Sequence, residues 1–310
     1  MNTSSNHTLN ADHPLSKGQR LRWLYLNWLN NRHPQAELDS SLQQRIFPAH
    51  QHLQPWASID TLVSPARRLC DLFWHAMPWQ NIAAAMGRPV RLLEVGCGSG
   101  RYGTLLRDRM GANFGGYTGL DVMPDQAWTA LAEDPRFHFH RAGAADVSGF
   151  LDGADLVFTQ SAIEHFDTDL DFMRQIAKYT AANPRPFLQV HLMPSAGGLR
   201  TFMWHGVRNY TPRTISRMTR LFGADTVRIL YSLGSGRCNL AHRQRITYPW
   251  LLGRPDGRKQ DPAGYDQQLR RAIEGDATHP RANEACFYAL VLLHRMPANL
   301  FDSWHAPCAD

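Results

Sequence analysis

A buried strand that runs directly into a glycine-rich turn constrains the fold of this chain more than any other feature. Residues Val90–Val95 are mostly apolar, as expected of a parallel strand covered on both faces, and Gly96, Gly98 and Gly100 follow them. A helix is predicted to begin near Arg101. Glycine lets the backbone turn sharply and lets a ligand approach the main chain where a Cβ would collide. The segment therefore predicts the first strand, turn and helix of an α/β fold that binds a ligand at the turn.

Two acidic residues flank this turn in the sequence. Glu94 lies near the end of the apolar strand, where a lone carboxylate is costly to bury and should face a cation or a donor, such as an ammonium group. The resulting pattern, E-x-G-x-G-x-G, differs from the G-x-G-x-x-G of dinucleotide sites. Asp121 ends the next predicted strand, within residues 117–123, at an interval where an acid commonly binds ribose hydroxyls. The alternative is that Asp121 only caps the following helix.

The segment from Val90 to Phe166 resembles class I S-adenosylmethionine-dependent methyltransferases, particularly the group acting on small molecules, lipids and sugars. The resemblance implies a Rossmann-like, mostly parallel seven-stranded sheet with helices on both faces, and S-adenosylmethionine as the cofactor. It implies that the methionine end of the cofactor is held by Glu94, Gly96, Cys97, Gly98 and Gly100. It also matches Asp121 to the ribose-binding acid, and Val122 with Met123 to the apolar contact on adenine.

Two later blocks extend the resemblance. In residues 137–147, Gly143 stands where these enzymes often have an aspartate, so that recognition of the adenine amino group falls to Asp146 or to the backbone at Ala144. Residues 154–166 form an apolar strand that opens into a polar loop. In this last block the resemblance places Gln160 and Ser161 beside the methionine and His165 near the transferable methyl group. The alternative for this loop is a helix start in which Glu164 and His165 are only solvated.

Length and composition agree with an enzyme of this kind. The 310 residues are 43% apolar, enough for a sizeable core, and no segment has the roughly 20 apolar residues of a membrane span. Five cysteines without a C-x-x-C pair indicate reduced thiols and a cytoplasmic protein, which could also be peripheral to a membrane. The net charge of +6 favours an anionic partner.

The anionic partner could be a phosphate group on a nucleotide sugar, a lipid carrier or a glycan, and a nucleic acid is not required. The alternative is that the basic residues form a solvated surface without a ligand. The arginines concerned are Arg200, Arg208, Arg213, Arg217, Arg220, Arg228, Arg237, Arg243 and Arg245.

Five segments are predicted along the chain. They are a disordered tail (1–14), a helical N-terminal extension (15–88), the cofactor-binding Rossmann-like core (89–195), an acceptor-binding insertion with the sixth strand (196–284), and the last strand with a C-terminal tail (285–310). Ser64 and Thr211, each followed by proline, predict helix starts. The fifth, sixth and last strands are expected at 186–193, 227–231 and 286–293, and the resemblance implies that the last is inserted antiparallel.

One helix of the N-terminal extension has an apolar face with basic residues nearby. The face consists of Leu21, Leu24, Tyr25, Trp28 and Leu29, and the basic residues are Lys17, Arg20 and Arg22. Packing of this face against the core is the default expectation. The alternative is contact of residues 15–31 with a membrane surface, because tryptophan, tyrosine and basic side chains suit the headgroup region.

The acceptor is expected to bind after the fifth strand, where Trp204, His205, Arg208 and Tyr210 follow a turn at a sheet's carboxyl edge. A packed lid without a ligand is the alternative. An aliphatic hydroxyl is a poor nucleophile and needs a general base, for which histidine is the first candidate. The candidates are His165, His191 and His205, and we prefer His165 or His205.

The preferred hypothesis is O-methylation of a sugar, a lipid-linked saccharide or a similar small metabolite. The alternatives are a catalytically inactive cofactor-binding partner subunit, which the glycine at position 143 permits, and a nicotinamide-dependent oxidoreductase. Glu94 and the glycine spacing disfavour the oxidoreductase.

Overall fold

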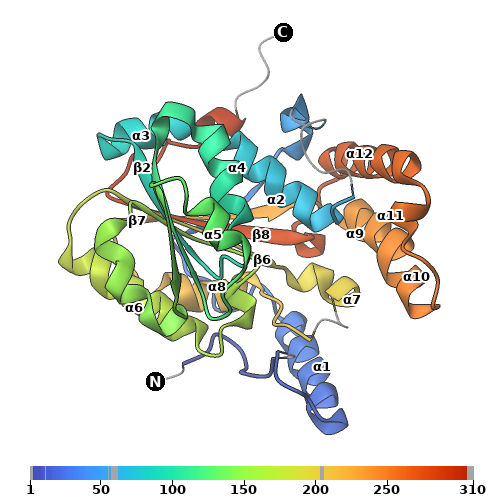
Figure 1. The fold of residues 1–310 in the computed structure, drawn as a ribbon. Coiled ribbons are helices and arrows are strands. Elements are labelled where there is room, and N and C mark those ends of the chain that lie inside the picture. The colour runs from blue at the N-terminus through green and yellow to red at the C-terminus, as the bar shows by residue number, and fades with distance from the viewer. Residues whose placement is uncertain (1–2, 11, 55, 57–61, 203–205, 306–310) are drawn as a thin grey trace.

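An eight-stranded sheet forms the centre of the molecule, and helices cover both of its faces (Figure 1). The computed structural model describes residues 3–10, 12–54, 56, 62–202 and 206–305. The strands are β1 (Leu42–Ile46), β2 (Val90–Val95), β3 (Phe114–Asp121), β4 (Phe137–Arg141), β5 (Leu156–Gln160), β6 (Phe187–Pro194), β7 (Thr226–Leu233) and β8 (Phe287–His294). Their order in the sheet is β1-β7-β8-β6-β5-β2-β3-β4.

The sheet confirms the mostly parallel topology and corrects the strand count. β8 pairs antiparallel with both β6 and β7, as the sequence predicted for the last strand, and the remaining pairs are parallel. The predicted seven strands become eight because β1 pairs in parallel with the edge of β7. β1 comes from the extension that was expected to be helical. Its sequence, LQQRI, is too polar and too short for its apolar pattern to predict a strand.

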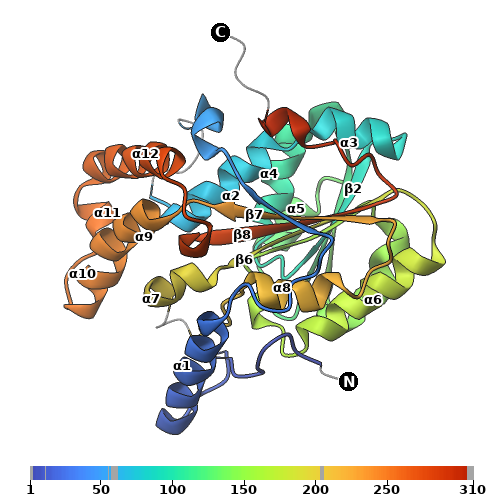
Figure 2. The same cartoon turned by 180° about the vertical axis from the view of Figure 1, so that it is seen from behind.

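Two helical layers bury the two faces of the sheet (Figure 2). The helices are α1 (Lys17–Arg32), α2 (Pro65–Ala76), α3 (Trp79–Met86), α4 (Arg101–Met110), α5 (Ala127–Leu131), α6 (Asp169–Ala182), α7 (Leu199–Phe202), α8 (Pro212–Thr219), α9 (Gly236–His242), α10 (Tyr248–Leu251), α11 (Gly257–Gln260) and α12 (Pro262–Thr278). One core contains side chains of α2, α3, α4, α9 and α12, and the other contains side chains of α6 and α8. Neighbouring residues of a strand enter opposite cores, as in Leu92 and Leu93.

Both predicted helix starts are confirmed. The Ser64 side chain accepts a hydrogen bond from the backbone N–H of Arg67 at the start of α2, and Thr211 accepts one from that of Thr214 at the start of α8. Proline at the first helical position has no N–H to leave unpaired. α2 contacts the helix that follows the glycine turn, because the hydroxyl of Tyr102 in α4 donates to Asp71 at 2.7 Å.

The expectation of a disordered tail over residues 1–14 is wrong for the part that the structure describes. Ser5 is fully buried, and its backbone N–H and hydroxyl both donate to the carboxylate of Asp169 at the start of α6. Asn10 is also buried and donates to the backbone carbonyl of His165 at 2.7 Å. Low apolar content suggested disorder, but these residues are held by hydrogen bonds to segments more than 100 positions away, which local composition cannot reveal.

The expectation that α1 packs its apolar face against the core is also wrong. The buried side chains of this helix are Trp23, Asn27 and Asn30, whereas Leu21 and Trp28 are 70% and 49% exposed. Asn27 hydrogen-bonds to His7 and accepts from the backbone N–H of Asn209, and Asn30 donates to the Asn209 carbonyl, so these two polar side chains anchor the helix. No described helix is both long enough and apolar enough to cross a membrane.

Candidate functional site

The turn between β2 and α4 has the left-handed backbone that its glycines permit. Gly96, Gly98 and Gly100 have φ of 80°, 51° and 77°. A Cβ on Gly96 would collide with the Cβ of Ala162, and one on Gly100 would lie 2.7 Å from the ring of Phe139. A Cβ on Gly98 would meet nothing within 4 Å. Two of the glycines are therefore required by packing, and the middle one faces open space where a ligand could approach the main chain.

Asp121 closes the turn from the neighbouring strand. One carboxylate oxygen accepts from the backbone N–H of Gly98 at 2.8 Å, and the other accepts from that of Met123 at 3.0 Å. Val122 and Met123 are 60% and 70% exposed, although both are large and apolar. Trp128 donates its indole N–H to the carbonyl of Gly98 at 2.7 Å. The arrangement leaves an acid and an exposed apolar surface beside the open side of the turn, which fits a ribose and an adenine ring.

Glu94 lies under the turn. It is 1% exposed, and the hydroxyl of Tyr117 donates to its carboxylate at 2.5 Å. Burial raises the pKa of Glu94 to about 8. The donor that the sequence required is therefore a phenol from β3, and contact with the cofactor's ammonium group stays a prediction. Cys97 is buried beside it, and burial raises the pKa of its thiol, as expected of a packing residue.

The third block lies beside the predicted adenine contact. Gly143 approaches Val122, because a Cβ on this glycine would lie 3.3 Å from a methyl group of Val122. Asp146 accepts from the backbone N–H of Gly143 at 2.9 Å, and the carbonyl of Ala144 accepts from Gln175 at 3.2 Å. Asp146 therefore stabilises the loop at Gly143, the position where the resembled enzymes often have an aspartate. Binding of the adenine amino group by Asp146 stays a prediction.

The loop after β5 contacts the glycine turn through Ala162 and bears several polar groups. Gln160 accepts from the indole N–H of Trp74 at 2.9 Å, and Ser161, with φ of 54°, donates to Glu164 at 2.7 Å. Glu164 is 2% exposed, burial raises its pKa, and its second carboxylate oxygen has no hydrogen-bond partner in the described structure. A buried carboxylate with an unused acceptor indicates a place for a donor from a ligand.

A cleft of about 460 Å³ opens beside this loop. Its lining comes from distant parts of the chain: Asp12, Ser64, Ser161, Glu164, His165, Pro194, Val207, His242, Ile246, Arg258 and Phe287. A second cleft of about 330 Å³ shares His242 and Ile246 with the first and extends to Trp250 and Arg254. Sequence reasoning found only Ser161, Glu164 and His165 of this lining, because nothing in the sequence brings the other residues to the same sheet edge.

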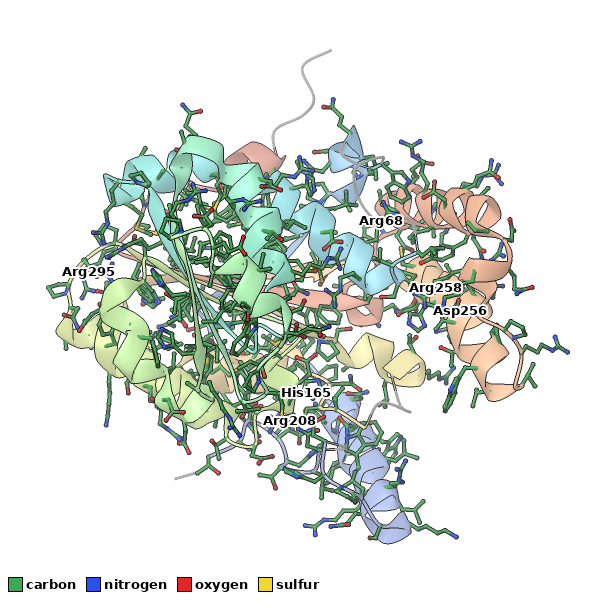
Figure 3. All side chains as sticks on the ribbon, viewed as in Figure 1. Arg68, His165, Arg208, Asp256, Arg258 and Arg295 are labelled. Carbon is green, nitrogen blue, oxygen red and sulfur yellow. The ribbon has the colours of Figure 1, made fainter. Side chains whose placement is uncertain are left out.

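His165 is held in the cleft by a carboxylate. Its Nδ1 lies 2.8 Å from a carboxylate oxygen of Asp12, and its side chain is 38% exposed. Asn10 fixes both partners, since its amide donates to the carbonyl of His165 and to the Asp12 carboxylate. A histidine with Nδ1 bound to a carboxylate can accept a proton at Nε2. Figure 3 labels His165 at the edge of the sheet that faces α1.

The other two histidine candidates differ in outcome. His191 is a core residue of β6: Thr159 hydrogen-bonds to its Nδ1 at 3.1 Å, and its Nε2 lies 3.2 Å from the amide oxygen of Gln189. Burial lowers the pKa of His191 to about 3, so the prediction that it serves as a base is wrong. His205 and Trp204 lie outside the described residues.

Arg208 and Tyr210 were predicted to bind the acceptor, and the structure corrects both. Arg208 is 2% exposed and donates to Ser4 and to three backbone carbonyls, among them that of His7. Tyr210 is also buried, and its hydroxyl donates to Ile163 and Asp169. Arg208 anchors the N-terminal segment, and Tyr210 holds the loop after β5 and the start of α6, so both are structural residues. Sequence reasoning could not detect this because the partners lie more than 40 positions away, in the loop before α6 and in the segment that was expected to be disordered.

Several of the arginines that suggested an anionic partner are neutralised within the molecule. Arg228 forms a buried pair with Asp39 at 3.0 Å, and Arg213 and Arg217 lie beside Glu37. Arg220 donates to the backbone carbonyl of Glu37. These arginines stabilise the connection between α8, β7 and the residues before β1, so they offer little to a phosphate.

The segment that forms this site matches a known family. Residues 93–183 match the family described as "Methyltransferase domain". This part of the chain is a methyltransferase domain. The matched part of the domain begins in β2 and ends just after α6, so it includes the glycine turn, Asp121 and the loop of His165. Among curated proteins, none matches this sequence.

Solved structures with a similar chain path include other methyltransferases. The plantazolicin methyltransferase BpumL in complex with SAH is 12% identical, with 90% of this chain and 99% of that chain covered and a TM-score of 0.44. The 1,6-didemethyltoxoflavin-N1-methyltransferase of Burkholderia thailandensis is 14% identical, with 92% of each chain covered and a TM-score of 0.38. The [4+2]-cyclase SpnF is 15% identical, with 71% and 80% covered and a TM-score of 0.43.

Proposed function

We propose that this protein transfers the methyl group of S-adenosylmethionine to a hydroxyl of a sugar, a lipid-linked saccharide or a similar small metabolite. The observation that carries the proposal is the position of His165. It lies in the cleft at the sheet edge, in the loop that contacts the glycine turn, with a carboxylate bound to one ring nitrogen. This arrangement suits removal of a proton from an acceptor hydroxyl.

The cofactor would lie along the open side of the glycine turn. Gly98 leaves room for the main chain to contact it, Asp121 would bind the ribose hydroxyls, and Val122 with Met123 would cover the adenine. Glu94 would support the methionine end from below, and Ser161 would lie near it. When bound, S-adenosylmethionine supplies an electrophilic methyl group together with its own leaving group.

The residues of the cleft would then manage one proton. Nε2 of His165 would accept the proton of the acceptor hydroxyl, whose oxygen would then take the methyl group that the bound cofactor supplies. Asp12 stabilises the resulting imidazolium through Nδ1. The unused oxygen of Glu164 would accept a hydrogen bond from a second acceptor hydroxyl, which orients the reacting one.

The acceptor segment 196–284 contributes Val207, His242, Ile246 and Arg258 to the cleft, in agreement with a role in acceptor choice. Arg258 is paired with Asp256 at 2.6 Å, so a phosphate on the acceptor would instead meet Arg254 at the second cleft. We include contact of residues 15–31 with a membrane in the proposal, because α1 exposes the apolar face that the sequence predicted.

Replacement of His165 tests the function. We expect His165→Ala to lower kcat about 10²–10⁴-fold, the usual contribution of a general base, with unchanged affinity for S-adenosylhomocysteine by calorimetry. Turnover is measured as S-adenosylhomocysteine release with a total lipid extract and with a water-soluble metabolite extract, and the methylated product is traced by mass spectrometry. His138→Ala, an exposed histidine on β4, is the matched control. Full activity of His165→Ala, or no response of the wild type to S-adenosylhomocysteine, would contradict the proposal.

A further inference from the structure

α1 exposes five large apolar side chains to solvent and buries two asparagines together with Trp23 against the protein. With 3.6 residues per turn, Trp23, Asn27 and Asn30 form one buried stripe. The opposite side of the helix holds side chains that are 38–70% exposed: Leu21, Leu24, Tyr25, Trp28 and Leu29. A surface helix that serves only the fold of its own domain has the reverse distribution. The exposed apolar stripe therefore requires a partner outside the described structure.

The charges on α1 indicate what kind of partner this is. The helix carries four basic residues, Lys17, Arg20, Arg22 and Arg32, and no acidic residue. The guanidinium of Arg32 lies 5.2 Å from the ring centroid of Trp28. Long basic side chains beside an exposed tryptophan can place their apolar stems along a hydrocarbon surface while the charges reach anionic headgroups.

A second cluster of the same kind lies on α9 and α10. Its exposed apolar side chains are Leu240, Tyr248, Trp250, Leu251 and Leu252, with exposed fractions of 43–64%. Residues 236–260, which contain this cluster, have six basic residues and one acidic residue. The two segments thus carry net charges of +4 and +5, against +6 for the whole chain, so the rest of the protein is net negative. Arg245 and Arg258 of the second segment are paired with Asp261 and Asp256, whereas the basic residues of α1 and the other basic residues of the second segment lie in the segments with exposed apolar surface.

The two clusters lie on either side of the clefts. Asp12, four residues before the cap of α1, lines the cleft of His165, and Trp250 of α10 lines the second cleft. His242 and Ile246 line both. In Figures 1 and 2, α1 and α10 extend away from the sheet on the same side, with α7 between them. Figure 3 shows His165 toward α1 and Arg258 toward α10 and α11.

We propose that α1 and the α9–α10 cluster form one docking surface for an anionic lipid bilayer, and that the cleft between them receives an acceptor carried by a lipid of that bilayer. This inference rests on the proposed function for the reaction itself. A second copy of the chain is a poorer occupant, because contact between copies would bring together segments of the same positive charge. An anionic headgroup layer satisfies both the charges and the exposed apolar side chains at once.

Vesicle flotation tests the docking surface with the full chain. The probes are vesicles of phosphatidylcholine alone and of phosphatidylcholine mixed with phosphatidylglycerol. We expect the wild type to float with the mixed vesicles, and the double variants Leu24→Ser/Trp28→Ser and Trp250→Ser/Leu252→Ser each to lose about tenfold or more in partitioning. Ile46→Ser, which removes a 41% exposed apolar side chain from the edge strand β1, is the matched control and should float like the wild type.

Several results would overturn the inference. One is a wild type that stays with the soluble fraction, and another is an α10 variant that floats like the wild type. A third is a wild type that does not float but is a dimer by light scattering, with variants that are monomers. Calorimetry with S-adenosylhomocysteine separates this inference from the proposed function. Variants that lose flotation but bind S-adenosylhomocysteine normally support the docking surface, whereas a wild type that floats but does not bind it would contradict only the proposed reaction.

Discussion

The glycine turn and the cleft of His165 lie at the same edge of the sheet, yet they are assembled in different ways. The turn comes from two neighbouring strands, and it is defined by backbone conformation, by the backbone hydrogen bonds of Gly96 and Cys97 to Leu120, and by the Asp121 side chain. The cleft is assembled from side chains whose positions run from Asp12 to Phe287. A site built from local backbone can be recognised from spacing alone, whereas a site built from distant side chains depends on the complete fold. Variants on the two sides should therefore fail differently.

The largest effect is expected on the turn side, from Gly96→Ala. Alanine there must adopt a left-handed conformation and overlap Ala162, which together should cost about 2–5 kcal/mol of the free energy of unfolding. Gly98→Ala has the conformational cost without the overlap, about 1–2 kcal/mol, and should weaken S-adenosylhomocysteine binding more than it lowers stability. Denaturant unfolding and calorimetry on both variants measure the difference. Equal stability of the two would show that packing does not distinguish these glycines.

On the cleft side, the largest expected effect comes from a residue that does not touch the cleft. Arg208→Gln removes buried hydrogen bonds that hold residues 4 and 7, and should lower the free energy of local opening of the N-terminal segment by about 3 kcal/mol. Hydrogen exchange of the Ser5 amide, which donates to Asp169, reports this opening. Turnover should fall because Asp12 is released, while S-adenosylhomocysteine affinity should not change.

Arg200→Gln, at an exposed arginine of α7, is the matched control for Arg208→Gln. If the Ser5 amide stays protected in Arg208→Gln, the N-terminal segment does not depend on this arginine. A loss of cofactor affinity would instead show that the two sides of the site are coupled.

The sequence predicted the parts of the fold that depend on short-range pattern. The glycine turn, the last strand and the caps at Ser64 and Thr211 follow from spacing, apolar runs and hydrogen bonding within a few residues, whereas the antiparallel direction of the last strand followed from the family resemblance. β1 was missed because a polar edge strand has no apolar alternation to detect. It pairs through its backbone with β7, and backbone pairing leaves little trace in residue type.

The predictions failed where a side chain has its partner far along the chain. Arg208 and Tyr210 have the composition of a ligand pocket, yet they bind the N-terminal segment and the loop before α6. His191 has the chemistry of a base, but its hydrogen bonds within the sheet make it a core residue. Residue type shows what a side chain can do, and only the tertiary contacts show whether it is accessible.

Glu94→Gln provides a smaller and pH-dependent effect on the turn side. Burial raises the pKa of Glu94 from 4.5 to about 8, so between these values the folded carboxyl keeps a proton that the unfolded chain releases. The stability of the wild type without ligand therefore falls as the pH rises from about 4.5 to about 8, and glutamine removes that loss. A shift of one pKa unit corresponds to about 1.4 kcal/mol. Half of the shift of Glu94 would therefore lower the free energy of unfolding by about 2 kcal/mol at pH 8.

We therefore expect the Tm of Glu94→Gln to equal that of the wild type near pH 4 and to exceed it increasingly up to pH 8, while S-adenosylhomocysteine binds more weakly. Differential scanning calorimetry across this pH range measures the trend. A constant Tm difference at all pH values would show that ionisation of Glu94 does not limit stability.

Asp12→Asn should give the smallest effect, and it bears most directly on how the cleft works. Asparagine can keep the hydrogen bond to Nδ1 of His165 but cannot stabilise an imidazolium by charge, so kcat should fall about tenfold, equivalent to about 1.4 kcal/mol. KM and S-adenosylhomocysteine affinity should stay unchanged, and Asp12→Glu should recover part of the loss. Asp167→Asn, beside His13 on the surface, is the matched control. If Asp12→Asn instead raises KM with kcat intact, Asp12 binds the acceptor rather than stabilising His165. The N-terminal segment that was expected to be disordered would then orient the substrate in the cleft.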